Sequence, residues 1–179
     1  MFKITETGFD GLRIVETSYF NDERGQFRKV FSKGEFSELG LDTDFREAYY
    51  SKSSKNVIRG MHFQTPPSDH AKVVYLIAGR IIDVCLDLRK KSNTYGRYFS
   101  IELSNVNPAY IFIPKGFAHG FVSLENDSIV HYMQTSCYEK SCDNGIRFDS
   151  FGFDWKLSNP ILSQRDLAFP AFTDFCSPF

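Results

Sequence analysis

The chain has 179 residues, which is enough for one domain with a substantial buried core. Hydrophobic residues make up 42% of the sequence and aromatic residues 16%, which excludes intrinsic disorder over most of its length. The net charge of −1 at pH 7 provides no general positive field, and this argues against nucleic acid binding driven by counterion release.

The N-terminus and the cysteines are typical of a protein from the cytoplasm. The first residues, MFKITETGFDG, carry charges and no long apolar run, so we expect no signal peptide. No apolar stretch of about eighteen residues occurs, and we expect no membrane contact. The four cysteines show no C-x-x-C spacing, and Cys85 lies in an apolar run where a thiol behaves as a small hydrophobe.

Alternation of apolar and polar residues dominates the chain and predicts strands. The segment 16–31, ETSYFNDERGQFRKVF, predicts two strands around a turn at 21–25. The following segment, KGEFSELGL, predicts one short helix, with Ser32 as N-cap and Gly40 as its end.

The centre of the chain predicts further strands separated by Gly, Asn, Pro and Ser. The segments KVVYLIAG and RIIDVCLDLR predict two strands that meet in a tight turn at Gly79 and Arg80. The later strands are expected at 97–103, 109–114, 119–124 and 128–138. Such short strands at near-regular intervals favour an all-β antiparallel barrel or sandwich.

The last part of the chain predicts little regular structure. SQRDLAF predicts a turn of helix, with Ser163 as cap and Pro170 as its end. The segment after Trp155 is rich in Pro, Ser and Phe and is expected to wrap the barrel as irregular chain. No repeat or linker is visible, so residues 1–179 are interpreted as a single domain with short peripheral helices.

A small barrel can enclose an interior wide enough for a ligand, so polar residues on its inner face are candidates for a functional site. Alternation places Ser128, Val130, Tyr132 and Gln134 on one face of their strand and His131 on the other. We therefore interpret His131 as a structural residue. The residues expected to face the interior are His62, His119, Tyr132, Lys72 and Asp83.

The histidine spacing disfavours a metal site. Barrels that bind iron, manganese or zinc favour two histidines one residue apart, followed by an acid. Here His62 and His70 are eight positions apart, and no H-x-H occurs. A satisfied structural histidine remains the alternative for each of them.

An acid–base site fits these residues better. Removal of a proton next to a ketone needs a base with a pKa near neutrality, and histidine has an ordinary pKa of about 6.5. The enolate oxygen needs a cation such as Lys72, and a tyrosine across the interior could return a proton to the opposite face. A carboxylate behind the histidine would fix its tautomer and stabilise its charged form.

Six motifs in order resemble the dTDP-4-dehydrorhamnose 3,5-epimerase family, from about residue 8 to about residue 170. They are FNDERGQF, SKNVIRGMHFQ, DVCLDLRKKSNTYGRY, IELS, IPKGFAHGF and PILSQRDLAFP. The resemblance implies a cupin, or jelly-roll, β-barrel that uses no metal and no organic cofactor. It also implies inversion at carbon 3, carbon 5 or both, beside the 4-keto group of a nucleotide-linked sugar.

The resemblance assigns catalytic roles residue by residue. His62 in RGMHFQ matches the general base, and Asp166 in LSQRD matches its carboxylate partner. Tyr132 in VHYMQT matches the proton donor of the opposite face, and Lys72 matches the lysine near the 4-keto oxygen.

Other matches concern the rest of the pocket. His119 and Asp83 match polar pocket residues of less defined role, and a purely structural carboxylate is the alternative for Asp83. The basic residues that match the diphosphate region are Arg24 and Arg59, with Arg165 where the family has a lysine. Tyr138 is expected beside the nucleobase, unless it only ends a surface strand.

The family forms homodimers in which N-terminal strands pair across the interface. The resemblance therefore implies that Arg24 serves the pocket of a neighbouring subunit, with a simple turn residue as the alternative.

The sequence departs from the family at positions that recognise the nucleotide in the family. Lys29 stands where the family usually has glutamate, and Glu47 and Tyr49 stand in its usual Gln-x-Asn pattern. An ammonium cannot accept the hydrogen bond that a carboxylate accepts from a base N–H. CDP- or GDP-linked sugars, including heptoses, therefore join dTDP sugars as expected partners. His70 lies in the stiff loop TPPSDHAK, where it either reaches the sugar or a phosphate or caps the loop, and the loop cap is slightly favoured.

Taken together, the sequence predicts a metal-free epimerase of a nucleotide-linked 4-keto-6-deoxy hexose or heptose, in deoxysugar biosynthesis for surface polysaccharide. The alternatives are a nucleotide-sugar 3,4-ketoisomerase and a non-catalytic nucleotide-sugar-binding barrel. The presence of His62, Tyr132 and Asp166 together disfavours both.

Overall fold

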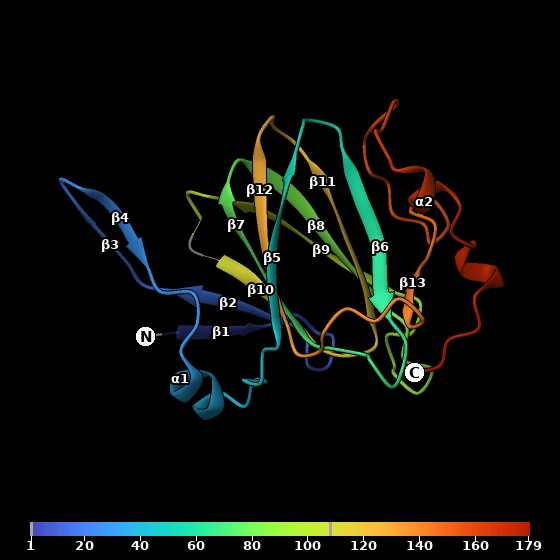
Figure 1. Cartoon of the computed structure of the whole chain (residues 1–179), viewed down its shortest axis with the longest axis horizontal. Helices are drawn as coiled ribbons and strands as arrows, with labels where there is room; N and C mark the ends of the chain where they lie inside the picture. Colours follow the sequence, from blue (N-terminus) through green and yellow to red (C-terminus); the bar gives the residue numbers. More distant parts are fainter. Residues whose placement is uncertain (1, 108) are drawn as a thin grey trace.

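The computed structural model describes residues 2–107 and 109–179, and its main feature is a pair of facing antiparallel sheets (Figure 1). The six-stranded sheet has the order β1-β2-β10-β7-β12-β5, and the five-stranded sheet has the order β13-β6-β11-β8-β9. The predicted all-β fold with short peripheral helices is thereby confirmed.

The strands are short, as the sequence predicts. The six-stranded sheet contains β1 Phe2–Glu6, β2 Arg13–Thr17, β5 Glu47–Ser53, β7 Lys72–Ala78, β10 Ala109–Ile113 and β12 Ser128–Gln134. The five-stranded sheet contains β6 Ile58–Gln64, β8 Arg80–Asp87, β9 Tyr98–Ser104, β11 Phe117–Ser123 and β13 Asp143–Gly145. The remaining elements are β3 Tyr19–Asp22, β4 Gly25–Arg28, the helices α1 Lys33–Glu38 and α2 Gln164–Leu167, and a 3-10 turn at Phe172–Asp174.

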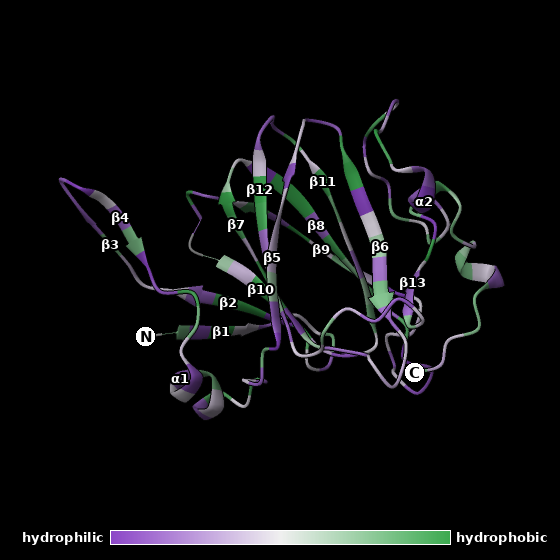
Figure 2. Cartoon of the chain, in the orientation of Figure 1, coloured by the Kyte–Doolittle hydropathy of each residue, from purple (hydrophilic) through white to green (hydrophobic). Residues whose placement is uncertain are grey.

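Apolar side chains from both sheets fill much of the interior. Leu76 and Val130 come from one sheet, and Ile81, Leu103 and Phe121 come from the other. Burial follows the predicted alternation of β12, where every second residue from Ser128 to Gln134 is buried. Figure 2 shows the hydrophobic colouring along β7 and β8, whereas β6 alternates between hydrophobic and hydrophilic stretches.

The C-terminal segment covers the outer face of the five-stranded sheet. Phe151 and Trp155 are buried against Ile58, Met61 and Val84 from the outer side of that sheet. Aromatic residues nearer the C-terminus pack partly buried on the same cluster. The expectation that this segment wraps the barrel is confirmed, and Figure 1 shows it running alongside β6 and β13.

The turn between β7 and β8 occurs at the predicted place but joins two different sheets. Gly79 has a φ of +86°, a conformation that glycine adopts without steric cost. β7, before this glycine, pairs with β10 and β12, whereas β8, after it, pairs with β11 and β9. A local pattern predicts the turn, but only tertiary packing separates the two strands.

The other local predictions are also confirmed. Helix α1 follows Ser32 and is followed by Gly40 with a φ of +70°, although the Ser32 side chain makes no capping bond. In α2 the Ser163 side chain does accept a hydrogen bond, from the Asp166 backbone N–H. The β3–β4 hairpin projects from the body of the molecule in Figure 1. No helix in the described residues is long and apolar enough to span a membrane.

Close contact between β6 and β11 brings two polar positions together. His119 and His62 are direct register partners, so both face the interior. This pairing depends on Gly120, where an added Cβ would lie 2.7 Å from the Arg59 carbonyl oxygen and 2.8 Å from Met61 Sδ.

We therefore predict that Gly120→Ala lowers the free energy of unfolding by about 1–3 kcal/mol, because the strands would have to separate. Chemical denaturation followed by circular dichroism measures the change. The matched control is Gly34→Ala in α1, where an added Cβ meets nothing within 4 Å. That control should gain roughly 0.5–1 kcal/mol from its higher helix propensity. Equal stability of Gly120→Ala and the wild type would contradict the prediction.

Candidate active site

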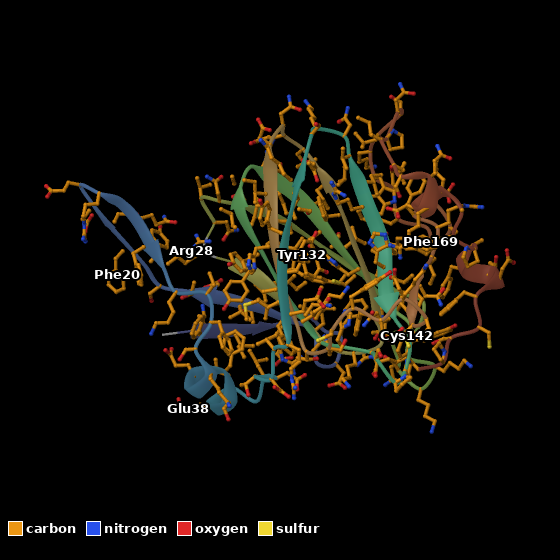
Figure 3. The ribbon with its side chains drawn as sticks, in the orientation of Figure 1. Phe20, Arg28, Glu38, Tyr132, Cys142 and Phe169 are labelled. Carbon is orange, nitrogen blue, oxygen red and sulfur yellow. The ribbon has the colours of Figure 1, made fainter. Side chains whose placement is uncertain are left out.

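A cavity of about 310 Å³ opens between the sheets, and most of the residues that line it carry polar side chains. The lining residues come from both sheets, the loops at one end and the C-terminal segment. They are Glu47, Tyr49, His62, Phe63, Gln64, His70, Lys72, Gln134, Tyr138, Asp143 and Arg165. Six of these were predicted as site residues from the sequence. In Figure 3 Tyr132 lies centrally in the barrel, and Phe169 lies toward α2.

His62 and Asp166 form a hydrogen-bonded pair at the wall of the cavity. His62 Nε2 lies 2.9 Å from Asp166 Oδ1, and the carboxylate is buried. Asp166 Oδ2 also accepts the Gly60 backbone N–H at 3.2 Å, and Ser163 anchors the start of its helix. Because Asp166 occupies Nε2, the other ring nitrogen of His62 is the one left to accept a proton from a ligand.

The environment of Asp166 favours its charged form. Burial alone would raise the pKa of this carboxyl, but hydrogen bonds from His62 and Gly60 lower it below the ordinary value. A carboxylate in this position stabilises a positively charged imidazole and holds its ring in place. The pair therefore has the arrangement of a general base with its orienting group.

Tyr132 lies on β12 in the opposite sheet, and it is almost fully buried. Its hydroxyl is 3.2 Å from Ser51 Oγ, and its ring stacks on Tyr49 with centroids 4.8 Å apart. Burial raises the pKa of Tyr132 above that of an ordinary phenol. The phenol therefore keeps its proton at neutral pH and can act as a proton donor.

Lys72 brings a cation to the same cavity. Its side chain is only 7% exposed, and the described residues offer its ammonium group neither a hydrogen bond nor an ion pair. Burial lowers the pKa of Lys72 to about 8, although Cys85, Asp143 and Asp83 act in the opposite direction. A buried ammonium group at the cavity wall is suited to stabilise an oxygen that gains negative charge.

His119 and Asp83 lie deeper than the cavity wall. His119 Nε2 is 2.8 Å from Asp83 Oδ2, and both side chains are buried. The His119 ring meets Tyr132 edge-on, with centroids 6.2 Å apart. This pair thus supports the floor beneath Tyr132 and does not line the cavity.

The mouth of the cavity holds a second group of polar contacts. Arg165 pairs with Asp143 at 2.7 Å and lies over the Phe169 ring. Glu47 accepts a hydrogen bond from the Tyr138 backbone N–H at 2.6 Å, and the Tyr138 side chain is exposed. An exposed aromatic ring beside charged groups is suited to a flat polar ligand such as a nucleobase.

Arg59 lies on the other side of His62. Its Nε donates to Ser53 Oγ at 3.0 Å, and it lines an adjoining cavity of about 350 Å³ together with His62, Arg165 and Asp166. Two arginines thus flank the His62–Asp166 pair, as expected for a ligand that carries phosphate.

Comparison with known proteins decides the family. A family model described as dTDP-4-dehydrorhamnose 3,5-epimerase matches residues 6–174. The chain belongs to this family. The predicted family and the cupin barrel fold are both confirmed, and the members of the family are named as epimerases.

Individual epimerases resemble the chain over nearly its whole length. The dTDP-4-dehydrorhamnose 3,5-epimerase of Methanothermobacter thermautotrophicus is 41% identical over 170 residues, which cover 92% of this chain and 91% of that protein. The crystal structure of the Elizabethkingia anophelis enzyme has a TM-score of 0.90 at 38% identity, covering 97% of each chain. The Legionella pneumophila epimerase in complex with dTDP-4-keto-L-rhamnose has a TM-score of 0.93 at 33% identity, covering 98% of this chain and 95% of that one.

The two predicted nucleotide-binding residues near the β3–β4 hairpin, Arg24 and Lys29, do not reach the cavity of their own chain. Arg24 lies at the tip of the β3–β4 hairpin, exposed and paired with Asp22. Lys29 follows β4 and pairs with Glu35 at 3.6 Å. Their assignment to the nucleotide in this epimerase therefore depends on a second subunit and stays a prediction.

The structure favours the alternative in which His70 faces the ligand cavity over the loop cap. Its ring is 93% buried in the cavity wall, with Nδ1 3.0 Å from Ser136 Oγ and 3.3 Å from Gln64 Nε2. Burial lowers its pKa to about 3, so the ring is neutral at physiological pH. No local signal distinguished a histidine in a loop from one in the wall, because the distinction depends on how the loop folds back.

Gln64 and Gln134 also line the cavity, although the sequence analysis did not single them out as ligand-binding residues. The available signal was alternation, since each lies two residues after a site residue, His62 or Tyr132, on the same face. His131 lies on the outer face as predicted, with its ring 4.7 Å from that of Tyr75. Among residues 2–107 and 109–179, no cluster of three His, Cys, Asp or Glu side chains could hold a metal ion.

The buried position of Lys72 leads to a pH prediction. Because its pKa is lowered to about 8, the ammonium charge is present below that pH and is lost as the pH rises through it. If the charge stabilises a reacting oxygen, kcat/KM should fall about tenfold per pH unit above pH 8. Steady-state rates between about pH 6 and 10 measure this limb, and a profile that stays flat to about pH 10 would contradict it.

Proposed function

We propose that this protein is a 3,5-epimerase of a dTDP-linked 4-keto-6-deoxy sugar in deoxysugar biosynthesis. The observation that carries the proposal is the His62–Asp166 pair on one sheet, with the buried phenol of Tyr132 on the other. Lys72 supplies the buried cation that an enolate needs. Family membership supports the dTDP-linked hexose as the substrate.

The first step removes a proton from a carbon next to the keto group. The free nitrogen of His62 takes the proton, and the electrons of the C–H bond move onto the keto oxygen to give an enolate. Lys72 stabilises this oxygen, while Asp166 stabilises the imidazolium that forms. General base catalysis of this kind contributes about 10²- to 10⁴-fold to a rate.

The second step returns a proton to the opposite face of the same carbon. Tyr132 donates its phenolic proton, the enolate double bond collapses to the ketone, and the configuration is inverted. The raised pKa of Tyr132 keeps the proton on the phenol until the enolate forms. Proton exchange with solvent then restores Tyr132 and His62, so the reaction needs no oxidant and no co-substrate.

Both carbon 3 and carbon 5 neighbour the keto carbon, so the same pair of groups can act at either position. Inversion at both requires the sugar to be presented twice to His62 and Tyr132. The departures at Glu47 and Tyr49 both line the cavity.

We expect wild-type protein in heavy water to incorporate deuterium at carbon 3 or carbon 5 of dTDP-4-keto-6-deoxyglucose. His62→Ala should reduce this exchange by about 10²- to 10⁴-fold, because the base is lost. Proton NMR of the substrate follows both positions. The matched control is His131→Ala, which removes a histidine from the outer face and should leave the exchange intact.

The outcome of that experiment separates the candidate functions. A wild-type protein that binds dTDP sugars without any exchange would contradict the proposal and favour a binding protein. Formation of a 3-keto product would instead identify a ketoisomerase. The same assay with CDP- and GDP-linked 4-keto sugars, including heptoses, tests whether the departures at Lys29, Glu47 and Tyr49 change the preferred nucleotide.

We further propose that the protein acts as a homodimer in which the β3–β4 hairpin serves the partner's cavity. The hairpin projects from the barrel, and its facing residues Phe20 and Phe27 are 70% and 64% exposed. Exposed aromatic rings on a projecting hairpin favour burial against another surface. Arg24 at the tip then supplies positive charge for a diphosphate.

This arrangement predicts complementation between two defective variants. Arg24→Ala should raise KM by about 10- to 100-fold through the loss of a charged contact, and His62→Ala lacks the base. A mixed dimer would contain one cavity with both residues intact. Equal mixtures after subunit exchange should therefore recover about a quarter of wild-type activity at low substrate concentration. Mixtures no more active than the separate variants would contradict the shared cavity.

A further inference from the structure

Tyr49 lies directly over the phenol ring that is proposed to donate the proton. The two residues are register partners on β5 and β12, so both point into the barrel. Their rings are stacked, with centroids 4.8 Å apart and planes 20° apart. Tyr49 lines the cavity and is 40% exposed, whereas Tyr132 is 7% exposed and does not line it. The ring of Tyr49 thus stands between Tyr132 and part of the cavity.

A chain of hydrogen bonds holds Tyr49 in this position. The Tyr49 hydroxyl donates to Gln134 Oε1 at 3.3 Å, and Gln134 Nε2 donates to Glu47 Oε2 at 3.3 Å. Glu47 in turn accepts the backbone N–H of Tyr138 at 2.6 Å. These hydrogen bonds therefore run from the Tyr138 backbone at the mouth of the cavity to the ring that stacks on Tyr132.

Two residues in this series of hydrogen bonds stand at positions where the sequence departs from its family. Glu47 and Tyr49 replace the usual Gln-x-Asn pattern, and both contact the same amide group of Gln134. They act as one unit, because the amide of Gln134 can donate to Glu47 and accept from Tyr49 at the same time.

The stack limits the movement of Tyr132. A tyrosine ring turns about two side-chain torsions, and a second ring against its face excludes many of the rotations. The other constraint is at the tip, where the Tyr132 hydroxyl meets Ser51 Oγ at 3.2 Å. Because Tyr49 contacts its face and Ser51 contacts its hydroxyl, the phenol of Tyr132 can deliver a proton from only a narrow range of orientations.

We propose that Tyr49 is a positioning residue for Tyr132 and that it biases proton delivery toward one of the two carbons beside the keto group. This inference rests on the proposed epimerase function and deepens it. Carbons 3 and 5 lie on either side of the keto carbon, so a phenol confined to one orientation serves them unequally. A phenol that can move serves them more equally.

The test compares Tyr49→Ala with Tyr49→Phe. Tyr49→Ala removes the stack, and we expect kcat to fall about 10- to 100-fold, because small displacements of a catalytic group are costly. KM should stay within about threefold, since a contact made through Tyr132 acts on the chemical step. Tyr49→Phe keeps the ring and should restore most of kcat.

The second measurement is the ratio of deuterium incorporated at carbon 3 and carbon 5, read by NMR. We expect this ratio to change by at least about threefold in Tyr49→Ala and to stay close to the wild-type value in Tyr49→Phe. The control is Tyr50→Ala, which removes the neighbouring ring of the same strand from the outer face, where it is 68% exposed. Melting temperatures of all variants verify that each is folded.

The results of these experiments distinguish failure of the Tyr49 inference from failure of the proposed epimerase function. Tyr49→Ala with an unchanged kcat and an unchanged ratio overturns the inference and leaves the epimerase function standing. A rise in KM alone also overturns it, because Tyr49 would then be only a binding contact. Absence of exchange in the wild type overturns the proposed function itself, and the inference with it.

Discussion

The hydrogen bonds of the Asp166 carboxylate connect the parts of the molecule on which the site depends. Its two oxygens accept from the His62 ring and the Gly60 backbone, so one side chain joins the C-terminal segment to strand β6. A buried carboxylate without these partners would be costly. The same contacts that satisfy it also orient the histidine, and for this reason the C-terminal segment is part of the site and not only a cover for the barrel.

Burial acts on the other reacting groups with opposite consequences. The barrel interior disfavours the charged form of each group, so it raises the pKa of Tyr132 and lowers that of Lys72. Tyr132 therefore stays protonated as a donor requires, whereas Lys72 keeps its charge only up to about pH 8. Burial in the interior thus keeps Tyr132 protonated and sets an upper pH limit for the charge of Lys72.

Two of the departures from the family pattern, Glu47 and Tyr49, form one connected region. Glu47 and Tyr49 share Gln134, and through it they link the mouth of the cavity to Tyr132. Changes that looked like altered nucleotide recognition in the sequence therefore also reach Tyr132, the proposed proton donor. Replacement of Tyr49 is therefore expected to change the stereochemistry of proton return through its contact with Tyr132.

The sequence by itself determined much of the local structure. Alternation predicted the inward face of β12 with Tyr132 and the outward position of His131, because a strand turns successive side chains to opposite faces. Glycine conformations and the Ser163 cap likewise depend on neighbouring residues only. The resemblance to a family, and not any local pattern, predicted that Asp166 pairs with His62 across 104 positions.

Only the tertiary structure decided which distant groups meet. It separated β7 and β8 into different sheets, placed His70 in the cavity wall and stacked Tyr49 on Tyr132. It also left Arg24 outside the cavity of its own chain. These outcomes depend on how strands far apart in the sequence pair and pack, and periodicity within a segment carries no information about its partners.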